Sequence, residues 1–323
     1  MILLTGGTGF LGQFIIRELL ARGEKVRLLV RNPSKVQAQP GVELVEGDVL
    51  DTASLEVAFE GVDSVIHGAA VVSFWPRRRQ EMTRINVEGT ANMVDFALEA
   101  KVKKFVHISS IAALGRISGA PKIDETSKWV KSPLNSAYGR SKYLAELEVY
   151  RGVEEGLQAV ICNPGVIVGP GHWDQGSPKL FGSVAKGLKF YNPGQTGFVS
   201  VQDVARATVA LLFSDLVDGE RFVLVSENML YKDLFGLVAK SLGVKGPSIV
   251  PPAIVSAMAG RLSEWVGNLR NREPIITKET TRSSRHIFNY DGSKITRTIG
   301  FQYGSLADCI AETGAQYRKE HGN

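Results

Sequence analysis

The chain opens with a short apolar run that leads directly into a glycine-rich loop, Thr5-Gly-Gly-Thr-Gly-Phe-Leu-Gly12, followed by a helical pattern. Between a strand and a helix, Gly6 permits a tight turn, Gly9 lets a ligand approach the backbone, and Gly12 lets the helix pack closely on the strand. The free N–H groups of the helix N-terminus favour a phosphate. We therefore predict that this loop binds the pyrophosphate of a dinucleotide; a glycine-rich turn without a ligand is the alternative.

Short β-branched runs and helical patterns alternate through the first 170 residues. The expected strands are Ile2–Thr5, Val26–Val30, Val42–Glu46, Ser64–His67, Phe105–Ser109 and Ala159–Asn163. The expected helices are Leu11–Ala21, Ala53–Glu60, Glu81–Ala100 and Ala137–Glu155. Apolar strands that alternate with helices indicate a parallel sheet with helices on both faces. The sequence therefore predicts an α/β fold with a doubly wound parallel sheet.

The pattern changes after Pro170, where glycines and prolines become frequent. Further expected elements are a helical piece at Leu180–Leu188, a helix at Val201–Phe213, a strand at Arg221–Val225 and mostly helices from Tyr231 on. Segments that follow a completed sheet usually cover the carboxyl ends of its strands. We expect a dinucleotide-binding domain at 1–170, to which 198–225 returns. Residues 171–197 and 226–323 would form a smaller, mostly helical substrate cap with the C-terminal elements.

Charge and cysteine content exclude several kinds of partner. In 323 residues, 38 Lys and Arg against 33 Asp and Glu leave a net charge of +5 without a basic stripe, so no nucleic-acid partner is expected. The two cysteines, Cys162 and Cys309, have no metal-ligand spacing, which predicts no metal site and suits a reducing compartment, the cytoplasm. The apolar stretch Ile249–Gly260 is too short for a membrane span and lacks a basic polar face. We expect it to form a helix packed on the body, and no membrane partner.

The end of the second strand carries the prediction of the cofactor type. No acidic residue occurs from Lys25 to Val42, although a site for NAD(H) usually places Asp or Glu there. Arg31, with Lys35 close behind, would instead bind a 2′-phosphate, which favours NADP(H) over NAD(H). The alternative is that Arg31 stacks on the adenine or faces solvent. Asp48, after the third strand, would accept from the adenine amino group or cap a helix.

Three residue types indicate acid–base chemistry. Tyr138 and Lys142 are four positions apart on an expected helix and therefore share one face. An ammonium group near the phenol would lower the phenol pKa and make Tyr138 a tunable proton donor. Ser109 and Ser110 end a buried strand at the sheet edge that holds the glycine-rich loop, where a hydroxyl would hold a carbonyl oxygen. His67, at the end of the fourth strand, is expected to be a packed residue.

An ordered set of motifs resembles the extended short-chain dehydrogenase/reductases. The set comprises the glycine-rich loop, His67-Gly-Ala-Ala70, Asn86-Val-Glu-Gly-Thr90, Ser109-Ser110, Tyr138-x-x-x-Lys142 and Asn163-Pro-Gly-Val-Ile-Val-Gly-Pro170. The resemblance implies a Rossmann fold with Ser110, Tyr138 and Lys142 as the catalytic set and Asn86 supporting a water relay. It also implies a homodimer formed through Glu81–Ala100 and the Tyr138 helix. The expected cofactor contacts are Gly6, Thr8, Gly9, Phe10, Leu11, Gly12, Arg31, Lys35, Asp48, Val49, Ala69, Ala70, Tyr138, Lys142, Pro164 and Val166.

Departures from the family pattern bear on the substrate. Ile111-Ala112-Ala113 stands where sugar dehydratases would need an acidic pair, and Thr196-Gly-Phe-Val-Ser-Val201 replaces a motif of many nucleotide-sugar enzymes. The pattern is closer to members resembling dihydroflavonol reductases and 3β-hydroxysteroid dehydrogenases. We expect an NADP(H)-dependent oxidoreductase that interconverts a small-molecule ketone or aldehyde and an alcohol. The alternatives are a nucleotide-sugar epimerase or dehydratase with tightly bound NAD and a non-catalytic dinucleotide-sensing regulator.

Overall fold

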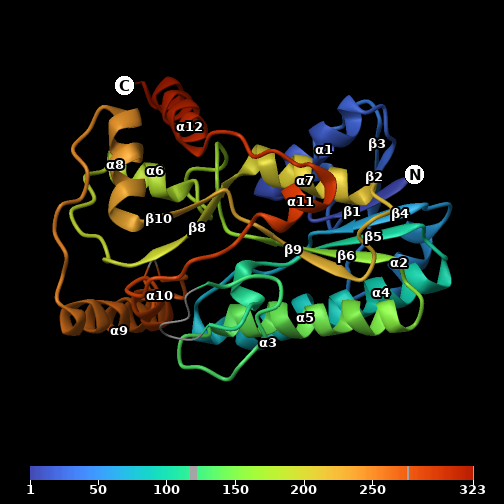
Figure 1. The fold of residues 1–323 in the computed structure, drawn as a ribbon, viewed down its shortest axis with the longest axis horizontal. Helices are drawn as coiled ribbons and strands as arrows, with labels where there is room; N and C mark the ends of the chain where they lie inside the picture. Colours follow the sequence, from blue (N-terminus) through green and yellow to red (C-terminus); the bar gives the residue numbers. More distant parts are fainter. Residues whose placement is uncertain (117–121, 275, 323) are drawn as a thin grey trace.

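The central element is a seven-stranded parallel sheet with the order β3-β2-β1-β4-β5-β6-β9 (Figure 1). The structure, a computed structural model, describes residues 1–116, 122–274 and 276–322. The order reverses between β1 and β4, which confirms the predicted doubly wound sheet. The strands are β1 (Ile2–Thr5), β2 (Val26–Val30), β3 (Val42–Glu46), β4 (Ser64–His67), β5 (Lys104–Ile108), β6 (Ala159–Pro164) and β9 (Glu220–Leu224).

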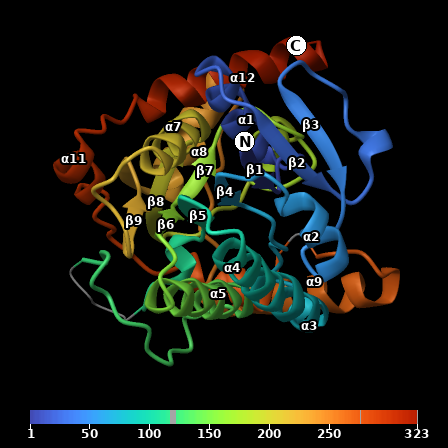
Figure 2. The same ribbon diagram turned by 90° about the vertical axis from the view of Figure 1, so that its right-hand side faces the viewer.

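Helices cover both faces of this sheet, because consecutive side chains on its buried strands point to opposite faces (Figure 2). Leu4 and Ile66 lie in a core with α1 (Phe10–Ala21), α7 (Val201–Leu212) and α11 (Lys294–Ile299). Leu3 and Val65 lie in a second core with α2 (Thr52–Phe59), α4 (Gly89–Glu99) and α5 (Ala137–Glu154). The strands are apolar throughout because both faces of the sheet are covered by helices, as predicted.

The register of the central strands aligns their carboxyl ends. Thr5 of β1 pairs with His67 of β4, and His67 pairs with His107 of β5. The residues that follow these strands therefore emerge together at one edge of the sheet. This edge gathers the glycine-rich loop, the segment after His67 and the two serines after β5.

The chain forms a second, small sheet, which the sequence did not predict. Its strands, in the order β10-β8-β7, are β7 (Val166–Val168), β8 (Gln195–Ser200) and β10 (Glu227–Leu230). They share a core with α6 (Lys179–Ala185), α8 (Tyr231–Leu242) and α12 (Leu306–His321). The predicted helical character of the C-terminal region is confirmed, whereas the domain boundaries stay a prediction.

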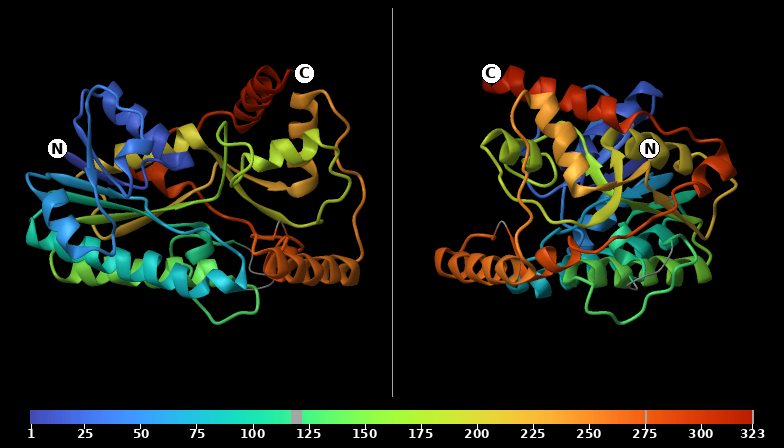
Figure 3. Two further views of the ribbon diagram at one scale, coloured as in Figure 1. Left: turned by 180° about the vertical axis from the view of Figure 1, so that it is seen from behind. Right: turned by 60° about the vertical axis from the view of Figure 1, so that its left-hand side comes forward.

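The segment Ile249–Gly260 enters the expected helix and packs on the rest of the chain, but only through small residues and backbone contacts. These residues lead into α9 (Ala253–Arg270), which is followed by α10 (Lys278–Ser283) and projects from the rest of the fold (Figure 3). Ile254, Val255 and Met258 are exposed, and the helix is buried only at small residues. In the described part of the chain, no helix is both long and apolar enough to cross a membrane.

The helix expected at Glu81–Ala100 is divided into three parts. α3 (Arg79–Thr83) is followed by one π-helical turn, Arg84–Glu88, and then by α4. A π-helical turn adds a residue to the local repeat and is frequent at functional sites. The turn contains Asn86, whose side chain it directs into the interior, and hydrophobic periodicity alone could not reveal it.

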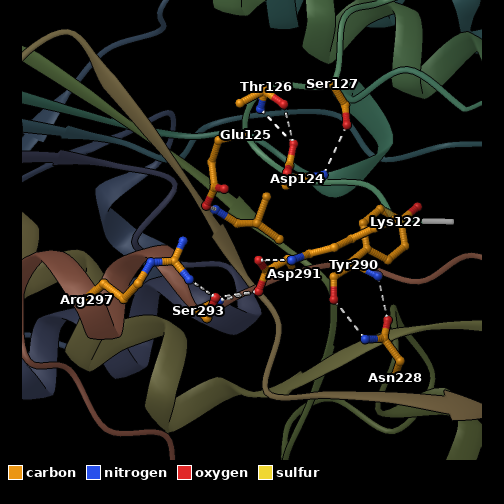
Figure 4. Close-up of polar contacts among 11 residues, drawn as sticks. Lys122, Asp124, Glu125, Thr126, Ser127, Asn228, Tyr290, Asp291, Ser293 and Arg297 are labelled. Carbon is orange, nitrogen blue, oxygen red and sulfur yellow. Dashed lines mark hydrogen bonds and ion pairs between the residues drawn. The ribbon is translucent and has the colours of Figure 1, made fainter. Parts of the chain in front are cut away.

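The segment that leads into α5 makes polar contacts with the edge strand β9 and with residues 289–291 (Figure 4). Glu125 Oε1 accepts a hydrogen bond from the Val223 backbone N–H of β9 at 2.8 Å, and Lys122 forms an ion pair with Asp291 at 2.5 Å. The Ile123 backbone N–H donates to the Asn289 carbonyl at 2.7 Å. These bonds hold residues 122–125, which precede the helix that carries Tyr138.

Two glycines set the geometry of the glycine-rich loop. Gly6 has a φ of +75°, and a Cβ there would lie 2.6 Å from the Gly68 carbonyl group. A Cβ on Gly12 would lie 2.4 Å from the Gly6 carbonyl oxygen and from the Gly7 Cα. Because these neighbours are backbone atoms, they cannot move aside as a flexible side chain would.

We predict that Gly12→Ala destabilises the protein by about 1–3 kcal/mol, since the added methyl group overpacks a site that backbone encloses. The matched control is Gly236→Ala in α8, where a Cβ would meet no heavy atom within 4 Å. There the higher helix propensity of alanine should leave stability unchanged or raise it by up to about 1 kcal/mol. Urea unfolding of both variants provides the measurement, and equal effects would contradict the close packing described.

Candidate active site at the carboxyl edge of the sheet

The N-terminus of α1 is open to an anion. Its N-cap is Gly9, so no side chain caps the helix, and the first turn has no acidic residue. Thr8 and Gly9 are exposed, and Phe10 and Leu11 are half-buried. Unsatisfied N–H groups at a helix start, next to glycines without side chains, form a cradle for a phosphate. The observed loop therefore fits the predicted pyrophosphate.

Two of the expected adenosine-side residues lie exposed after β2, the neighbour of β1. Arg31 follows β2 directly, and Lys35 ends a short 3-10 turn, Pro33–Lys35, that Asn32 caps by accepting from the Ser34 N–H at 3.1 Å. Both cationic side chains are therefore accessible to a phosphate group.

The acidic and apolar residues after β3 are more constrained. Asp48 Oδ1 accepts from the Leu50 N–H at 3.0 Å, so this carboxylate already stabilises the turn that leads into α2. Val49 is buried, and its side chain lies where a Cβ on Gly89 would clash. Asp51 occupies the N-cap position of α2 but makes no capping bond with its side chain.

Tyr138 and Ser110 lie together at this edge. Ser136 caps α5 by accepting from the Gly139 N–H at 2.9 Å, which fixes Tyr138 in the first turn of the helix. Burial raises the pKa of Tyr138 to about 12, and a hydrogen bond with Ser110 acts in the opposite direction. The Phe74 ring meets the Tyr138 ring edge to face, with 5.9 Å between centroids. The phenol therefore stays protonated at neutral pH, beside the Ser110 hydroxyl and the Phe74 ring.

Lys142 lies one turn after Tyr138 on α5 and is almost fully buried. Its Nζ donates to the Ile108 carbonyl oxygen at 2.7 Å and lies 3.4 Å from His107 Nε2. Burial lowers the pKa of Lys142 to about 8, against the charge of Glu146. In this structure the ammonium group of Lys142 is bonded at the end of β5, and burial has the largest effect on the pKa of Tyr138. The effect of Lys142 on the pKa of Tyr138 stays a prediction.

A buried polar cluster below the site distinguishes the two serines. Ser109 Oγ donates to Glu146 at 2.5 Å, and Asn163 Nδ2 donates both to Glu146 at 2.5 Å and to the Ser110 carbonyl oxygen at 3.0 Å. Arg221 forms an ion pair with Glu146 at 3.3 Å. Burial raises the pKa of Glu146, while these partners oppose the shift. Ser109 thus points into the interior, and only Ser110 is left to act at Tyr138.

Sequence reasoning missed Glu146 and Asn163 as members of this cluster. The signal was present, since Glu146 follows Lys142 by four residues and therefore lies on the same face of α5. A glutamate on the inward face of a helix needs partners, because an unpaired buried charge is costly.

Asn86 connects the helix layer to the segment after β4. Its Oδ1 accepts from the Val71 N–H at 2.7 Å, and its Nδ2 donates to the Val71 carbonyl oxygen and to Ser141 Oγ, each at 2.9 Å. Both Nδ2 hydrogens are therefore engaged within the protein. This arrangement suits a residue that positions the segment and α5 rather than one that holds a water molecule.

The remaining expected cofactor contacts lie along the same edge. The Ala69 N–H donates to Thr5 Oγ1 at 3.1 Å, and Ala69 and Ala70 are half-buried just after β4. Pro164 ends β6, and Val166 begins β7. Among the described residues, no group of three or more His, Cys, Asp or Glu is arranged to hold a metal ion.

His67 is a packed residue, as predicted. Its Nδ1 lies 2.8 Å from Thr5 Oγ1, and its Nε2 lies 3.0 Å from Thr90 Oγ1. Burial lowers the pKa of His67 to about 3 and holds the pKa of the adjacent His107 well below its usual value. Both rings are neutral at physiological pH, so neither is the acid of this site.

A comparison with known families decides the classification. The model of the NAD-dependent epimerase/dehydratase family matches residues 2–224, which include the whole site. The chain belongs to this family. With its relatives named as reductases and dehydrogenases, this family member is an NAD(P)-dependent oxidoreductase.

Individual relatives cover most of this family member. A putative dihydroflavonol 4-reductase of Synechocystis is 29% identical and covers 99% of this chain and 94% of its own. Sterol demethylase protein B of Methylococcus capsulatus is 36% identical over 80% of this chain and 79% of its own. The solved structure of gox2253 superposes with a TM-score of 0.83 at 33% identity, covering 100% of this chain and 98% of the other.

The two neutral histidines predict a pH dependence of stability. The unfolded chain binds protons at these histidines below about pH 6.5, whereas the folded chain resists protonation down to the lowered pKa values. Above this pH, the two histidines should therefore not reduce the free energy of unfolding. Below it, the free energy should fall by up to about 1.4 kcal/mol per pH unit for each of the two histidines.

Chemical unfolding from pH 7.5 to 5.5 measures this slope. His107→Leu should reduce the slope by about half, since one of the two contributing groups is removed. His172→Gln, at an exposed histidine, should leave the slope unchanged. A slope that is the same in all three proteins would show that the buried rings do not control it.

Proposed function

We propose that the protein uses NADP(H) to interconvert a ketone or aldehyde and the corresponding alcohol. The observation that carries this proposal is the contact between Ser110 and a protonated Tyr138, with Lys142 one helical turn away. Two hydroxyl groups at one point suit a carbonyl oxygen better than a phosphate or a carboxylate, which would need cationic partners. The site also lies at the sheet edge that the α1 N-terminus prepares for a dinucleotide.

The residues divide the chemistry among them. A nicotinamide bound along this edge would supply or accept the hydride. Ser110 and Tyr138 would donate hydrogen bonds to the carbonyl oxygen, where negative charge develops, and fixed donors stabilise that charge. Tyr138 would then transfer its phenolic proton to this oxygen. Lys142, one helical turn from Tyr138, would hold the cofactor ribose and offset the charge left on the phenolate.

The surroundings favour an apolar substrate over a nucleotide sugar. Phe74 stands against Tyr138, and the 3-10 turn after Ser110, Ile111–Ala113, is buried and without charge. Elimination from a sugar needs an acid and a base besides the tyrosine, and this turn supplies neither. The names of the relatives, a dihydroflavonol reductase and a sterol demethylase protein, support a ring-containing ketone or secondary alcohol.

The first test is oxidation of NADPH, followed by absorbance, with cyclic ketones and aldehydes and with nucleotide sugars in parallel. Net NADPH consumption with a carbonyl compound is the expected result. Turnover of nucleotide sugars without net cofactor change would contradict the proposal in favour of an epimerase. Binding of NADPH without turnover of any compound would favour a sensor.

We predict that Tyr138→Phe lowers kcat by about 10²–10⁴-fold, the usual contribution of a positioned acid, and leaves NADPH affinity nearly unchanged. Ser110→Ala should lower kcat more than Ser109→Ala does, because Ser109 Oγ is bonded to buried Glu146. Steady-state kinetics and cofactor fluorescence titration measure the two effects. Near-full activity of Tyr138→Phe would mean that another group supplies the proton.

We also predict the cofactor preference from the exposed cation after β2. Arg31→Ala should weaken NADPH binding by at least about tenfold, because a charge-assisted bond to the 2′-phosphate is lost, and should change NADH binding little. Arg22→Ala, at an exposed arginine following α1, is the control. Equal losses for both cofactors, or tighter NADH binding by the parent protein, would contradict the preference for NADP(H).

A further inference from the structure

Helix α9 presents its large apolar residues to solvent. We define the apolar stripe as Ile254, Met258, Leu262, Trp265 and Leu269, which are 59–74% exposed. Their spacing along the sequence places all five on one face of the helix. Val255 on the same helix and Ile249, Val250 and Ile276 beside it in sequence are exposed too. A soluble surface helix normally places such a stripe towards the core, so this face requires an explanation.

The opposite face of α9 shows why the stripe cannot turn inward. Its buried residues are Ser256, Gly260 and Gly267. A Cβ on Gly260 would lie 3.1 Å from the Thr277 carbonyl group, and one on Gly267 would lie 2.7 Å from the Arg272 carbonyl oxygen. Only small residues fit against this backbone. The outward direction of the stripe is therefore built into the packing of the helix.

Exposed arginines lie beside the apolar stripe. Arg261, Arg270 and Arg272 are exposed. The neighbouring carboxylates are engaged within the protein. Glu264 accepts from the Lys278 N–H at 2.7 Å, and Glu273 accepts from Ser73 Oγ at 2.5 Å and from Arg78 at 3.4 Å. Glu273 is exposed as well but is ion-paired with Arg78, so the three exposed arginines make this border complementary to a negatively charged surface.

We propose that α9 binds the surface of an anionic lipid bilayer, with the apolar stripe immersed at the boundary between headgroups and acyl chains. An apolar face that includes a tryptophan and has a cationic border is the pattern of a helix that lies in this interface. A second copy of the chain fits less well. In a second copy, the exposed arginines Arg261, Arg270 and Arg272 would face the same cationic residues, whereas an anionic bilayer offers the opposite charge.

This docking would bring the active site close to the bilayer. Trp75 Nε1 donates to Asn268 Oδ1 near the end of α9 at 2.8 Å, and Arg77 donates to the Asn268 carbonyl oxygen at 3.3 Å. Trp75 follows Phe74, whose ring meets that of Tyr138. An apolar substrate dissolved in the membrane would thus have a short path to Phe74. The bilayer binding itself does not depend on the proposed reaction.

Cosedimentation of the full chain with vesicles tests the proposal. The vesicles contain phosphatidylcholine alone or phosphatidylcholine with phosphatidylglycerol. The stripe variant is Ile254→Ser/Leu262→Ser/Trp265→Ser, and the matched control is Val57→Ser/Leu216→Ser, two exposed apolar residues of the body. A second variant, Arg261→Gln/Arg270→Gln/Arg272→Gln, leaves the stripe intact. Circular dichroism checks that every variant is folded.

The expected result is binding of the parent protein and of the control to the anionic vesicles. The stripe variant should partition at least about tenfold less, and the arginine variant should lose the preference for anionic lipid. If the stripe variant does not fold, the arginine variant decides the outcome alone. The proposal is overturned if the parent protein does not bind anionic vesicles or if both variants bind as the control does. It is also overturned if the parent protein is a dimer that the stripe variant makes monomeric, because a second copy then covers the stripe.

Discussion

The close approach of the Gly6 turn to the end of β4 is the constraint on which the site depends. A positive φ and a backbone neighbour at 2.6 Å leave room for no residue but glycine. The turn brings α1 over the sheet with its N-terminus aimed along the carboxyl edge, where β4 and β5 also end. The N-terminus of α1 and the Ser110–Tyr138 pair therefore lie at one edge of the sheet, as a consequence of strand register and of this close backbone contact.

Buried hydrogen bonds and an ion pair hold the polar groups of the site in place. Lys142, Glu146, His107 and His67 are all buried, and such groups are tolerated only with partners. Ile108, Ser109, Asn163 and Arg221 provide most of these partners. This supporting layer leaves Ser110 and Tyr138 as the hydroxyl pair that faces outward. Burial also has the largest effect on the pKa of the Tyr138 phenol.

Much of this architecture could be predicted from sequence, because it follows from short-range patterns. The order of strands, the glycine-rich loop and the Tyr138 and Lys142 spacing each appear within a few residues, and the corresponding strands and helices form almost where expected. The direction of the Lys142 ammonium group could not be predicted, since it depends on a carbonyl group of β5 distant in sequence. The π-helical turn at Asn86 likewise leaves no trace in periodicity.

The region after Pro164 shows a second limit of prediction from sequence. Its small sheet pairs strands of three to six residues, too short for a clear alternation, and α9 reverses the usual rule by facing its large residues outward. Hydrophobic periodicity identifies a face of a helix but not what covers it. Only the packing of Gly260 and Gly267 against backbone reveals the direction of that face.

The central claim is that one sheet edge joins a dinucleotide cradle to a Ser110–Tyr138 site for a carbonyl group. A crystal structure with NADP⁺ bound tests this claim most directly. The account predicts the pyrophosphate at the N-terminus of α1, the 2′-phosphate beside Arg31 and the nicotinamide ring beside Tyr138 with Lys142 on its ribose. A dinucleotide bound elsewhere, or a nicotinamide ring directed away from Tyr138, would contradict it.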